Sequence, residues 1–379
     1  MTAILGSLQN AFTIAAAFIF VLSVVVFFHE LGHFLVARWC GVKVKAFSIG
    51  FGKEIWGFND SHGTRWRVAW LPLGGYVKFL DDDSAASTPS ADALRNMTDE
   101  ERSGSFHLKP VWQRAAVVAA GPIANFILAI VIFSASISTY GVKTLEPRVG
   151  AVLAGSPAEI GGAKSGDMVL EIEGEKIEGS RDLQRIVSTH PEQDLKFLVD
   201  RGGTQLTLTI RPRLTEHDDP ISGKVKTPII GIQISPDAES AHRDVGPVEA
   251  VKLAVAQTSN IVTGTLGFFV DLARGRQSAD QLGGPIRIAE VSGQVAKFGF
   301  QPLLQLIGVI SVSIGLLNLF PIPLLDGGHL LFYAVEAVRR RPLSERTQEI
   351  GFRIGLAIVL MLMFFATLND LPILKKWFF

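Results

Sequence analysis

The sequence predicts a polytopic α-helical membrane protein with about four transmembrane helices, a membrane-associated β-hairpin and an inserted extracytoplasmic domain. Hydrophobic residues make up 48% of the 379 residues, and the mean hydropathy is +0.32 although the formal net charge is zero. The apolar residues are concentrated in uncharged stretches, each near the ~20 residues that a helix needs to cross a hydrocarbon core of ~30 Å. These stretches are Ala11 to Phe28, Ala115 to Tyr140, Pro302 to Leu325 and Ile354 to Asn369.

The first stretch continues directly into the motif His29-Glu30-Leu31-Gly32-His33. We expect it to be retained as a span, because the preceding residues carry no positive charge of the kind that opens a signal peptide. Residues i and i+4 share one helix face, so His29 and His33 can both bind one tetrahedral Zn²⁺. Glu30 lies about 100° around the helix and suits a general base that takes a proton from water and returns it to a leaving amine. The alternative, two histidines that only satisfy each other, is disfavoured because an ionisable cluster at membrane depth costs several kcal/mol without a partner or function.

The segment from Val44 to Leu80 alternates apolar and polar residues around two turn signals, Asn59-Asp60 and Gly74-Gly75. This pattern predicts strands joined in a hairpin. Because unpaired sheet edges are excluded from lipid, the hairpin must lie at the membrane surface or be buried against protein. We predict that an extended substrate pairs with it near Gly75, while a purely structural hairpin is the alternative.

The polar segment from Ser84 to Gly104 lacks periodicity and predicts a flexible linker. Basic residues dominate the region between spans one and two, and Arg339, Arg340, Arg341 and Arg346 lie between spans three and four. The positive-inside rule places both loops in the cytoplasm and the 141–301 segment outside. The zero net charge gives no reason to expect nucleic acid as a partner. A single cysteine, Cys40, excludes an intramolecular disulfide.

Pro147 to Leu214 predicts a small independent domain. Strands are expected at Val149–Leu153 and Met168–Ile172, a helix capped by Ser180, and a hairpin from Leu195 to Ile210 that turns at Gly202-Gly203. Its sequence GSPAEIGGAKSGDMVLEIEG resembles the PDZ domains of bacterial proteases, and the resemblance implies peptide binding by strand addition. The following apolar run, Leu253 to Val270, contains several polar residues and predicts an interfacial helix. A fifth span is the alternative.

The end of the third span carries Asn318-Leu-Phe-Pro321-Ile-Pro323-Leu-Leu-Asp326-Gly-Gly-His329. Two prolines cannot continue a regular helix, and freed backbone at membrane depth is tolerated where it lines a protein cavity. Asp326 would complete a His₂Asp site and leave the fourth metal position open, as catalytic zinc requires. His329 is a rival ligand, but a closed four-ligand site would exclude the hydrolytic water. Asn318 can hydrogen-bond the substrate or an oxyanion, or make an ordinary interhelical bond.

Together these segments resemble the site-2 protease family, the zinc intramembrane metalloproteases of peptidase family M50, and within it the bacterial branch, here with one PDZ domain. The resemblance is carried by the HExxH motif, by the NxxPxPxLDG pattern of Asn318 to Gly327, by GPIANF at Gly121 to Phe126, and by the hairpin. It implies that His29, His33 and Asp326 bind one Zn²⁺ per chain, that Glu30 is catalytic and that Asn318 positions substrate. We also assign substrate-positioning roles to Asn125, in GPIANF, and to Gly75.

The resemblance implies a multi-pass enzyme of the bacterial inner membrane, with a periplasmic PDZ domain and an active site toward the cytoplasm. Its substrates would be single-pass membrane proteins, such as anti-sigma factors or signal-peptide remnants, that an upstream site-1 protease has already trimmed. The PDZ domain would bind peptide termini, and the lipid bilayer is the surrounding partner. Family members with two tandem PDZ domains differ from this chain, so a size-filter role is left open. The alternative function is a membrane-embedded PDZ scaffold or receptor with a non-catalytic zinc site.

The predicted segments are transmembrane helix 1 with HExxH at 1–38, the cytoplasmic-side hairpin at 39–83, the linker at 84–110, transmembrane helix 2 at 111–141, the PDZ domain at 142–215, an extracytoplasmic linker with amphipathic helices at 216–301, transmembrane helix 3 with NxxPxPxLDG at 302–338, a cytoplasmic basic loop at 339–352 and transmembrane helix 4 at 353–372.

Overall fold

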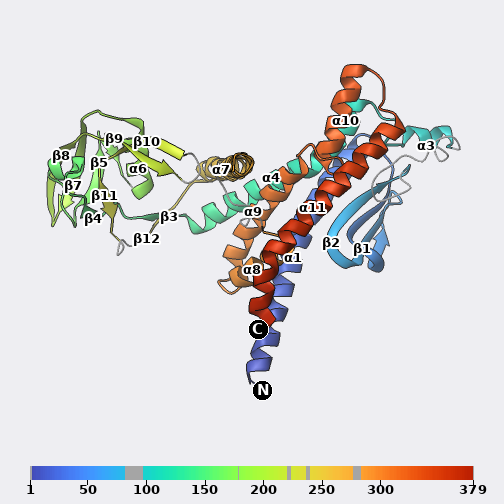
Figure 1. Cartoon of the computed structure of the whole chain (residues 1–379), viewed down its shortest axis with the longest axis horizontal. Coiled ribbons are helices and arrows are strands. Elements are labelled where there is room, and N and C mark those ends of the chain that lie inside the picture. Colours follow the sequence, from blue (N-terminus) through green and yellow to red (C-terminus); the bar gives the residue numbers. More distant parts are fainter. Residues whose placement is uncertain are drawn as a thin grey trace. The chain divides into compact units, whose positions relative to one another are not determined.

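The computed structural model describes residues 2–81, 97–177, 179–219, 223–235, 240–275 and 283–378 (Figure 1). The chain divides into two compact units. Unit 1 comprises residues 1–134 and 251–379, and unit 2 comprises residues 135–250.

Long apolar helices make up most of unit 1. Among the described residues, five helices are long and apolar enough to cross a membrane by length and composition, and they support a polytopic membrane protein. One of them covers the predicted interfacial helix, so the count of four spans stays a prediction. The helices are α1 (Thr2–Trp39), α4 (Val111–Tyr140), α7 (Pro247–Ala273), α8 (Pro285–Ala296), α9 (Phe300–Asn318), α10 (Asp326–Arg339) and α11 (Glu345–Phe378).

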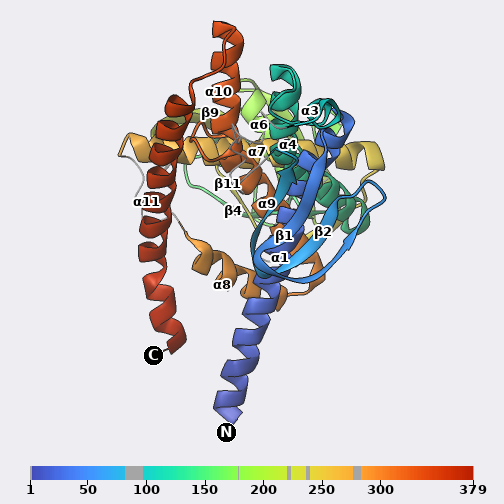
Figure 2. The same ribbon diagram turned by 90° about the vertical axis from the view of Figure 1, so that its right-hand side faces the viewer.

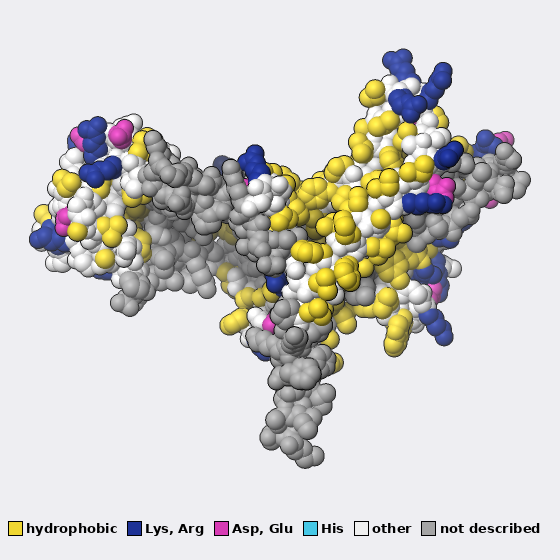
Figure 3. Space-filling view, in the orientation of Figure 1, with side chains coloured by type: hydrophobic (Ala, Val, Ile, Leu, Met, Phe, Trp, Pro, Cys, Tyr) yellow, Lys and Arg dark blue, Asp and Glu magenta, His cyan; other side chains and the backbone are white. Residues whose placement is uncertain are grey.

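The face of α11 that Figure 3 shows is largely apolar. Figure 3 shows hydrophobic side chains spread over the visible face of α11, with Lys and Arg side chains gathered near its junction with α10. Leu360, Met361 and Phe364 on α11 are all exposed in the protein alone, as expected for side chains that face lipid.

The predicted third span is two helices rather than one. Helix α9 ends at Asn318 and α10 begins at Asp326. Pro321 and Pro323 lie in the connection, where their rings remove backbone donors and prevent a continuous helix. The connection folds back tightly, because a Cβ atom on Gly327 would lie 2.3 Å from the backbone oxygens of Leu319 and Phe320. Because of this break, Asp326 is the first residue of a new helix, α10.

The predicted hairpin is confirmed as strands β1 (Val44–Asn59) and β2 (Arg65–Phe79), which pair antiparallel. Figure 2 shows both strands running along α1, against which they pack. Asp60 fixes the turn by accepting hydrogen bonds from the backbone N–H groups of His62 and Thr64. The predicted turn at Gly74-Gly75 lies at a reversal of the chain within β2, because Ser48 and Ile49 pair with Arg67 and Val68 before it and with Tyr76 and Gly75 after it.

The predicted flexible linker contains a short helix. Residues 84–96 lie outside the described residues, but α3 (Asp99–Ser103) is helical. The Thr98 side chain accepts from the backbone N–H of Glu101, whose carboxylate accepts from the backbone N–H of Thr98. This capping box explains local order that composition alone does not indicate.

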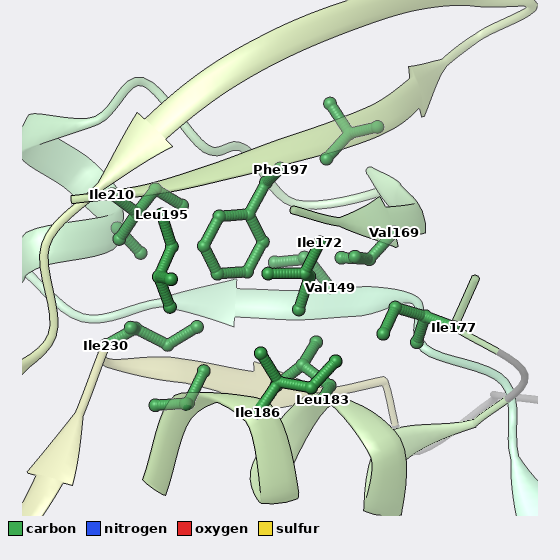
Figure 4. Close-up of a cluster of buried hydrophobic side chains, with 13 residues drawn as sticks. Val149, Val169, Ile172, Ile177, Leu183, Ile186, Leu195, Phe197, Ile210 and Ile230 are labelled. Atoms are coloured by element: carbon green, nitrogen blue, oxygen red, sulfur yellow. The ribbon is translucent and has the colours of Figure 1, made fainter. Parts of the chain in front are cut away.

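Unit 2 is built on a four-stranded antiparallel sheet in the order β6-β5-β7-β8, with α5 (Pro157–Ile160) and α6 (Ser180–Thr189) beside it. Apolar side chains of the sheet and of α6 form its core around Phe197 (Figure 4). Its strands are β3 (Val142–Leu145), β4 (Val149–Val152), β5 (Met168–Ile172), β6 (Glu175–Lys176), β7 (Leu195–Arg201), β8 (Thr204–Ile210), β9 (Arg213–Asp219), β10 (Gly223–Ile229), β11 (Ile232–Ile234) and β12 (Ser240–Arg243).

The strands predicted at 149–153 and 168–172 and the hairpin across Gly202-Gly203 are confirmed. Two details differ. The residue that caps α6 is Gly179, because Ser180 is already helical. The predicted end of this domain at residue 215 is too early, since β11 pairs with β4, β12 pairs with β3 and Ile230 belongs to the core. These long-range pairings leave no local periodic signal.

Candidate metal centre

Helix α1 brings His29 and His33 together, as their spacing predicts. Their Nε2 atoms are 3.3 Å apart and the two rings meet edge to face. The side chains of His29 and His33 are 11% and 12% exposed, so both imidazoles lie inside unit 1.

Asp326 approaches both imidazoles from the first turn of α10. Its Oδ2 atom lies 3.2 Å from His29 Nε2 and 3.5 Å from His33 Nε2. This oxygen is buried and has no hydrogen-bond partner. A buried carboxylate oxygen without a donor is costly unless a cation compensates it.

The three ligand atoms fit a zinc ion. Ligands ~2.0–2.2 Å from a tetrahedral zinc lie about 3.3–3.6 Å from one another, which is close to the three separations of 3.2, 3.3 and 3.5 Å. Among the described residues, His29, His33 and Asp326 form the one group of three His, Cys, Asp or Glu side chains close enough to hold a metal ion. A His₂Asp set leaves the fourth position of a tetrahedral ion free.

A cavity of about 620 Å³ borders these three side chains. Glu30 and Asn318 also line it, and the amide Nδ2 of Asn318 is 3.5 Å from His29 Nε2. The structure thus brings together, around one cavity, a carboxylate able to accept a proton and an amide able to donate a hydrogen bond.

Strand β2 forms one wall of this cavity through Gly74, Gly75, Tyr76 and Val77. A Cβ atom on Gly75 would lie 2.8 Å from Glu30 Cγ and 2.8 Å from the backbone oxygen of Ser48. Glycine at this position therefore lets β2 lie directly against the Glu30 side chain.

Asn125 does not line the cavity and lies on the other side of His29. Its side chain is 0% exposed, and its Nδ2 atom is 3.2 Å from His29 Nδ1. The predicted contact between Asn125 and substrate stays a prediction.

The rival ligand His329 is not among the converging side chains, and neither is Cys40. His329, one helical turn after Asp326, lines the cavity and contacts the ring of Phe352. Cys40 is partly buried and packs against the apolar cluster around Phe34 and Phe47. Sequence reasoning missed Val117, whose backbone oxygen is 2.8 Å from His33 Nδ1. It also missed the close approach of Gly121, where a Cβ atom would lie 2.2 Å from His33 Nε2.

Asp81 connects the end of the hairpin to the segment before α4. Its carboxylate is 1% exposed and accepts hydrogen bonds from His107 Nδ1 (2.9 Å), from the Ser105 hydroxyl and from the backbone N–H groups of Phe106 and His107. Burial alone would raise the pKa of Asp81, but the hydrogen bonds from His107 and Ser105 hold that pKa well below its usual range. Asp81 is therefore ionised near neutral pH and fixes Phe106, which lines the cavity.

Comparison with known proteins decides the family. The model of Peptidase family M50 matches residues 17–362. The chain belongs to peptidase family M50. A relative from Mesorhizobium japonicum, named as a zinc metalloprotease, is 49% identical to this M50 peptidase over 356 residues, which cover 93% of this chain and 97% of the relative. Metalloprotease MmpA of Caulobacter vibrioides is 41% identical over 376 residues, with coverage of 93% and 94%.

A solved PDZ domain of an SdrC-like protein from Listeria innocua matches 26% of this chain and 96% of its own length, at 22% identity and a TM-score of 0.19. At that score the likeness supports no conclusion. The family and its relatives confirm a zinc metalloprotease of the site-2 protease type, with Zn²⁺ as its cofactor.

Proposed function

We propose that this M50 peptidase is an intramembrane endopeptidase that cleaves single-pass membrane proteins after a first protease has trimmed them. The observation that carries the proposal is the placement of a carboxylate and a three-ligand metal cluster around one cavity among apolar helices. Hydrolytic groups at this depth suit a peptide bond that is itself presented from a membrane segment.

We propose His29, His33 and Asp326 as the zinc ligands. The orphaned Asp326 Oδ2 and the tetrahedral separations of the three ligand atoms support this assignment. Zinc bound here supplies the Lewis acidity that makes water nucleophilic and polarises the scissile carbonyl.

Glu30 acts as the general base and acid. It lines the cavity next to the ligand set and takes the proton of the attacking water. The same carboxylate then returns the proton to the nitrogen of the leaving amine. Asn318 lines the cavity beside His29 and donates its amide N–H to the substrate carbonyl oxygen, where negative charge develops.

The substrate lies extended against β2. Residues Gly74 to Val77 line the cavity, and Gly75 allows close approach to Glu30. Strand addition satisfies the backbone groups of a substrate segment that has left its helical state. Gly75 therefore positions substrate through its backbone.

The domain assignment and orientation are likewise proposals. We infer that the protein lies in the bacterial inner membrane with the hairpin and the loop of Arg339 to Arg341 in the cytoplasm, because both carry excess positive charge. Unit 2 is then periplasmic. We infer that it is a PDZ domain that receives a peptide terminus in the 700 Å³ cavity between α6 and residues 228–234.

The proposal is tested with the purified full-length protein in proteoliposomes. Single-pass membrane proteins with short and with full-length outer domains, together with signal-peptide remnants, are incubated with the wild-type protein and with Glu30→Gln. We expect the wild-type protein to cleave short substrates, and Glu30→Gln to keep zinc and lose at least about 100-fold in rate. Equal cleavage by both proteins contradicts the role of Glu30. Stoichiometric zinc and peptide binding without cleavage of any substrate would support the scaffold function instead.

A further inference from the structure

One face of α4 contacts both histidines of the metal centre. Val117, Gly121 and Asn125 are spaced four residues apart and therefore lie in one row along the helix. The row provides a backbone acceptor for His33, an open space for the two rings, and an amide next to His29.

The contact of Val117 shows what a metal-binding imidazole needs from this row. The Val117 backbone oxygen can only accept a hydrogen bond, so His33 Nδ1 carries the proton and donates to it at 2.8 Å. A neutral imidazole carries one proton, which leaves His33 Nε2 with a free lone pair that faces Asp326. His29 also directs its Nε2 atom at Asp326 and therefore also needs an acceptor at Nδ1.

Asn125 is the side chain next to His29 Nδ1. In the present orientation its donor Nδ2 faces Nδ1 at 3.2 Å, while its acceptor Oδ1 is buried without a hydrogen-bond partner. Turning the amide by 180° exchanges these two atoms and places Oδ1 at hydrogen-bond distance from His29 Nδ1. The turned amide oxygen accepts a hydrogen bond from His29 Nδ1–H. The other ring nitrogen, Nε2, then keeps its lone pair and is free to bind metal.

We propose that Asn125 is a positioning residue of the zinc site, and that its amide oxygen accepts a hydrogen bond from the Nδ1–H group of His29 and fixes Nε2 toward His33 and Asp326. This inference rests on the proposed ligand set. It differs from the substrate-positioning role, because the 0% exposed Asn125 side chain contacts His29 and is not among the residues that line the cavity. Partners of this kind orient a ligand and raise its basicity, and their loss typically weakens metal affinity by about 10–100-fold.

The test measures zinc affinity of the full-length protein in detergent by competition with a chromophoric chelator. Asn125→Leu is similar in size but has no acceptor, and we expect its zinc affinity to fall by about 10–100-fold. Asn125→Asp keeps an acceptor oxygen toward His29, so we expect affinity equal to or tighter than that of the wild-type protein. Rescue by this variant separates a positioning role from simple packing.

Ser311→Ala is the matched control for packing. The Ser311 hydroxyl donates to the backbone oxygen of Asn125 at 2.9 Å and links α9 to α4 at the same level of the helix. This variant loses an interhelical bond but keeps the amide, so we expect zinc affinity within about twofold of the wild-type value. Co²⁺ absorption spectra recorded on each variant report the ligand geometry independently of activity.

Wild-type zinc affinity in Asn125→Leu, or an equal loss in Asn125→Leu and Asn125→Asp, would overturn the inference. Thermal unfolding checks that each variant folds, and Asn125→Ala replaces Asn125→Leu if the larger side chain prevents folding. His29→Ala separates this result from the ligand assignment. If His29→Ala binds zinc as the wild-type protein does, the proposed ligand set fails, whatever the Asn125 variants do.

Discussion

Replacing Gly121 with alanine tests how closely α4 packs against the metal centre. The added Cβ atom would lie 2.2 Å from His33 Nε2, 2.5 Å from His33 Cε1 and 2.9 Å from His29 Cε1. Ordinary van der Waals contact begins near 3.4 Å, so the shortest approach falls about 1.2 Å short. Either the imidazoles or the backbone of α4 must move by roughly that distance.

Such a movement is large for a metal site, where ligand distances are held to within about 0.2 Å. A misplacement of about 1 Å at a catalytic centre typically costs about 100-fold in rate, which corresponds to about 2.7 kcal/mol. We therefore expect Gly121→Ala to lower kcat/KM by about 100-fold or more and to weaken zinc binding.

Cleavage of a trimmed single-pass substrate and chelator competition for zinc measure the two effects on the same preparation. Gly264→Ala is the control, because Gly264 is a helical glycine of α7 with open space at its Cβ position, and we expect it to behave as the wild-type protein. If Gly121→Ala binds zinc and cleaves at the wild-type level while it is fully folded, the close approach of α4 to the imidazoles is refuted.

Two further changes test the metal centre and unit 2. Asp326→Asn keeps the volume of the side chain but removes its charge, so we expect zinc affinity to fall by about 100-fold or more in chelator competition; unchanged affinity would remove Asp326 from the ligand set. In unit 2, burial would raise the pKa of Asp167, but the hydrogen bond and charge of Arg201 (2.7 Å) lower it below its usual value. The folded-state pKa of Asp167 lies below the unfolded value of about 3.9. The stabilisation of the folded state by ionised Asp167 is therefore complete above about pH 5 and is lost as the pH falls through the folded-state pKa. Limited proteolysis of the full chain should show that Asp167→Asn exposes unit 2 to cleavage at pH 7, with a difference from the wild-type protein that narrows at acidic pH; a pH-independent difference would exclude the electrostatic origin.

Local geometry explains which parts of the site were predicted from the sequence. His29 and His33 meet because they are one helical turn apart, and the two prolines after Asn318 predict the break that frees Asp326. The position of Asn125 depends instead on how α4 packs against α1, which single-sequence periodicity does not determine.

In the fold, too, local features were predicted from the sequence and long-range contacts were not. The hairpin from Leu195 to Ile210 was predicted because its strands adjoin their turn, whereas β11 pairs with β4 across about 80 residues of intervening chain. The pair Gly74-Gly75 lies at a reversal of the chain within β2, and Gly75 in addition allows close packing against Glu30. The sequence shows that a glycine is present, but only the three-dimensional structure shows which neighbouring atoms pack against it.

The position of Asp326, at the start of α10 and late in the chain, also has a consequence for biosynthesis. His29 and His33 emerge from the ribosome at the start of the chain, while Asp326 follows nearly 300 residues later. At about 5–20 residues per second, the first two ligands wait roughly 15–60 s for the third. With Asp326 as a ligand, an incomplete chain has Glu30 in place but no complete metal centre beside it. A nascent hydrolase that enters the membrane among other newly made proteins would thus stay inactive until almost the whole chain has been translated.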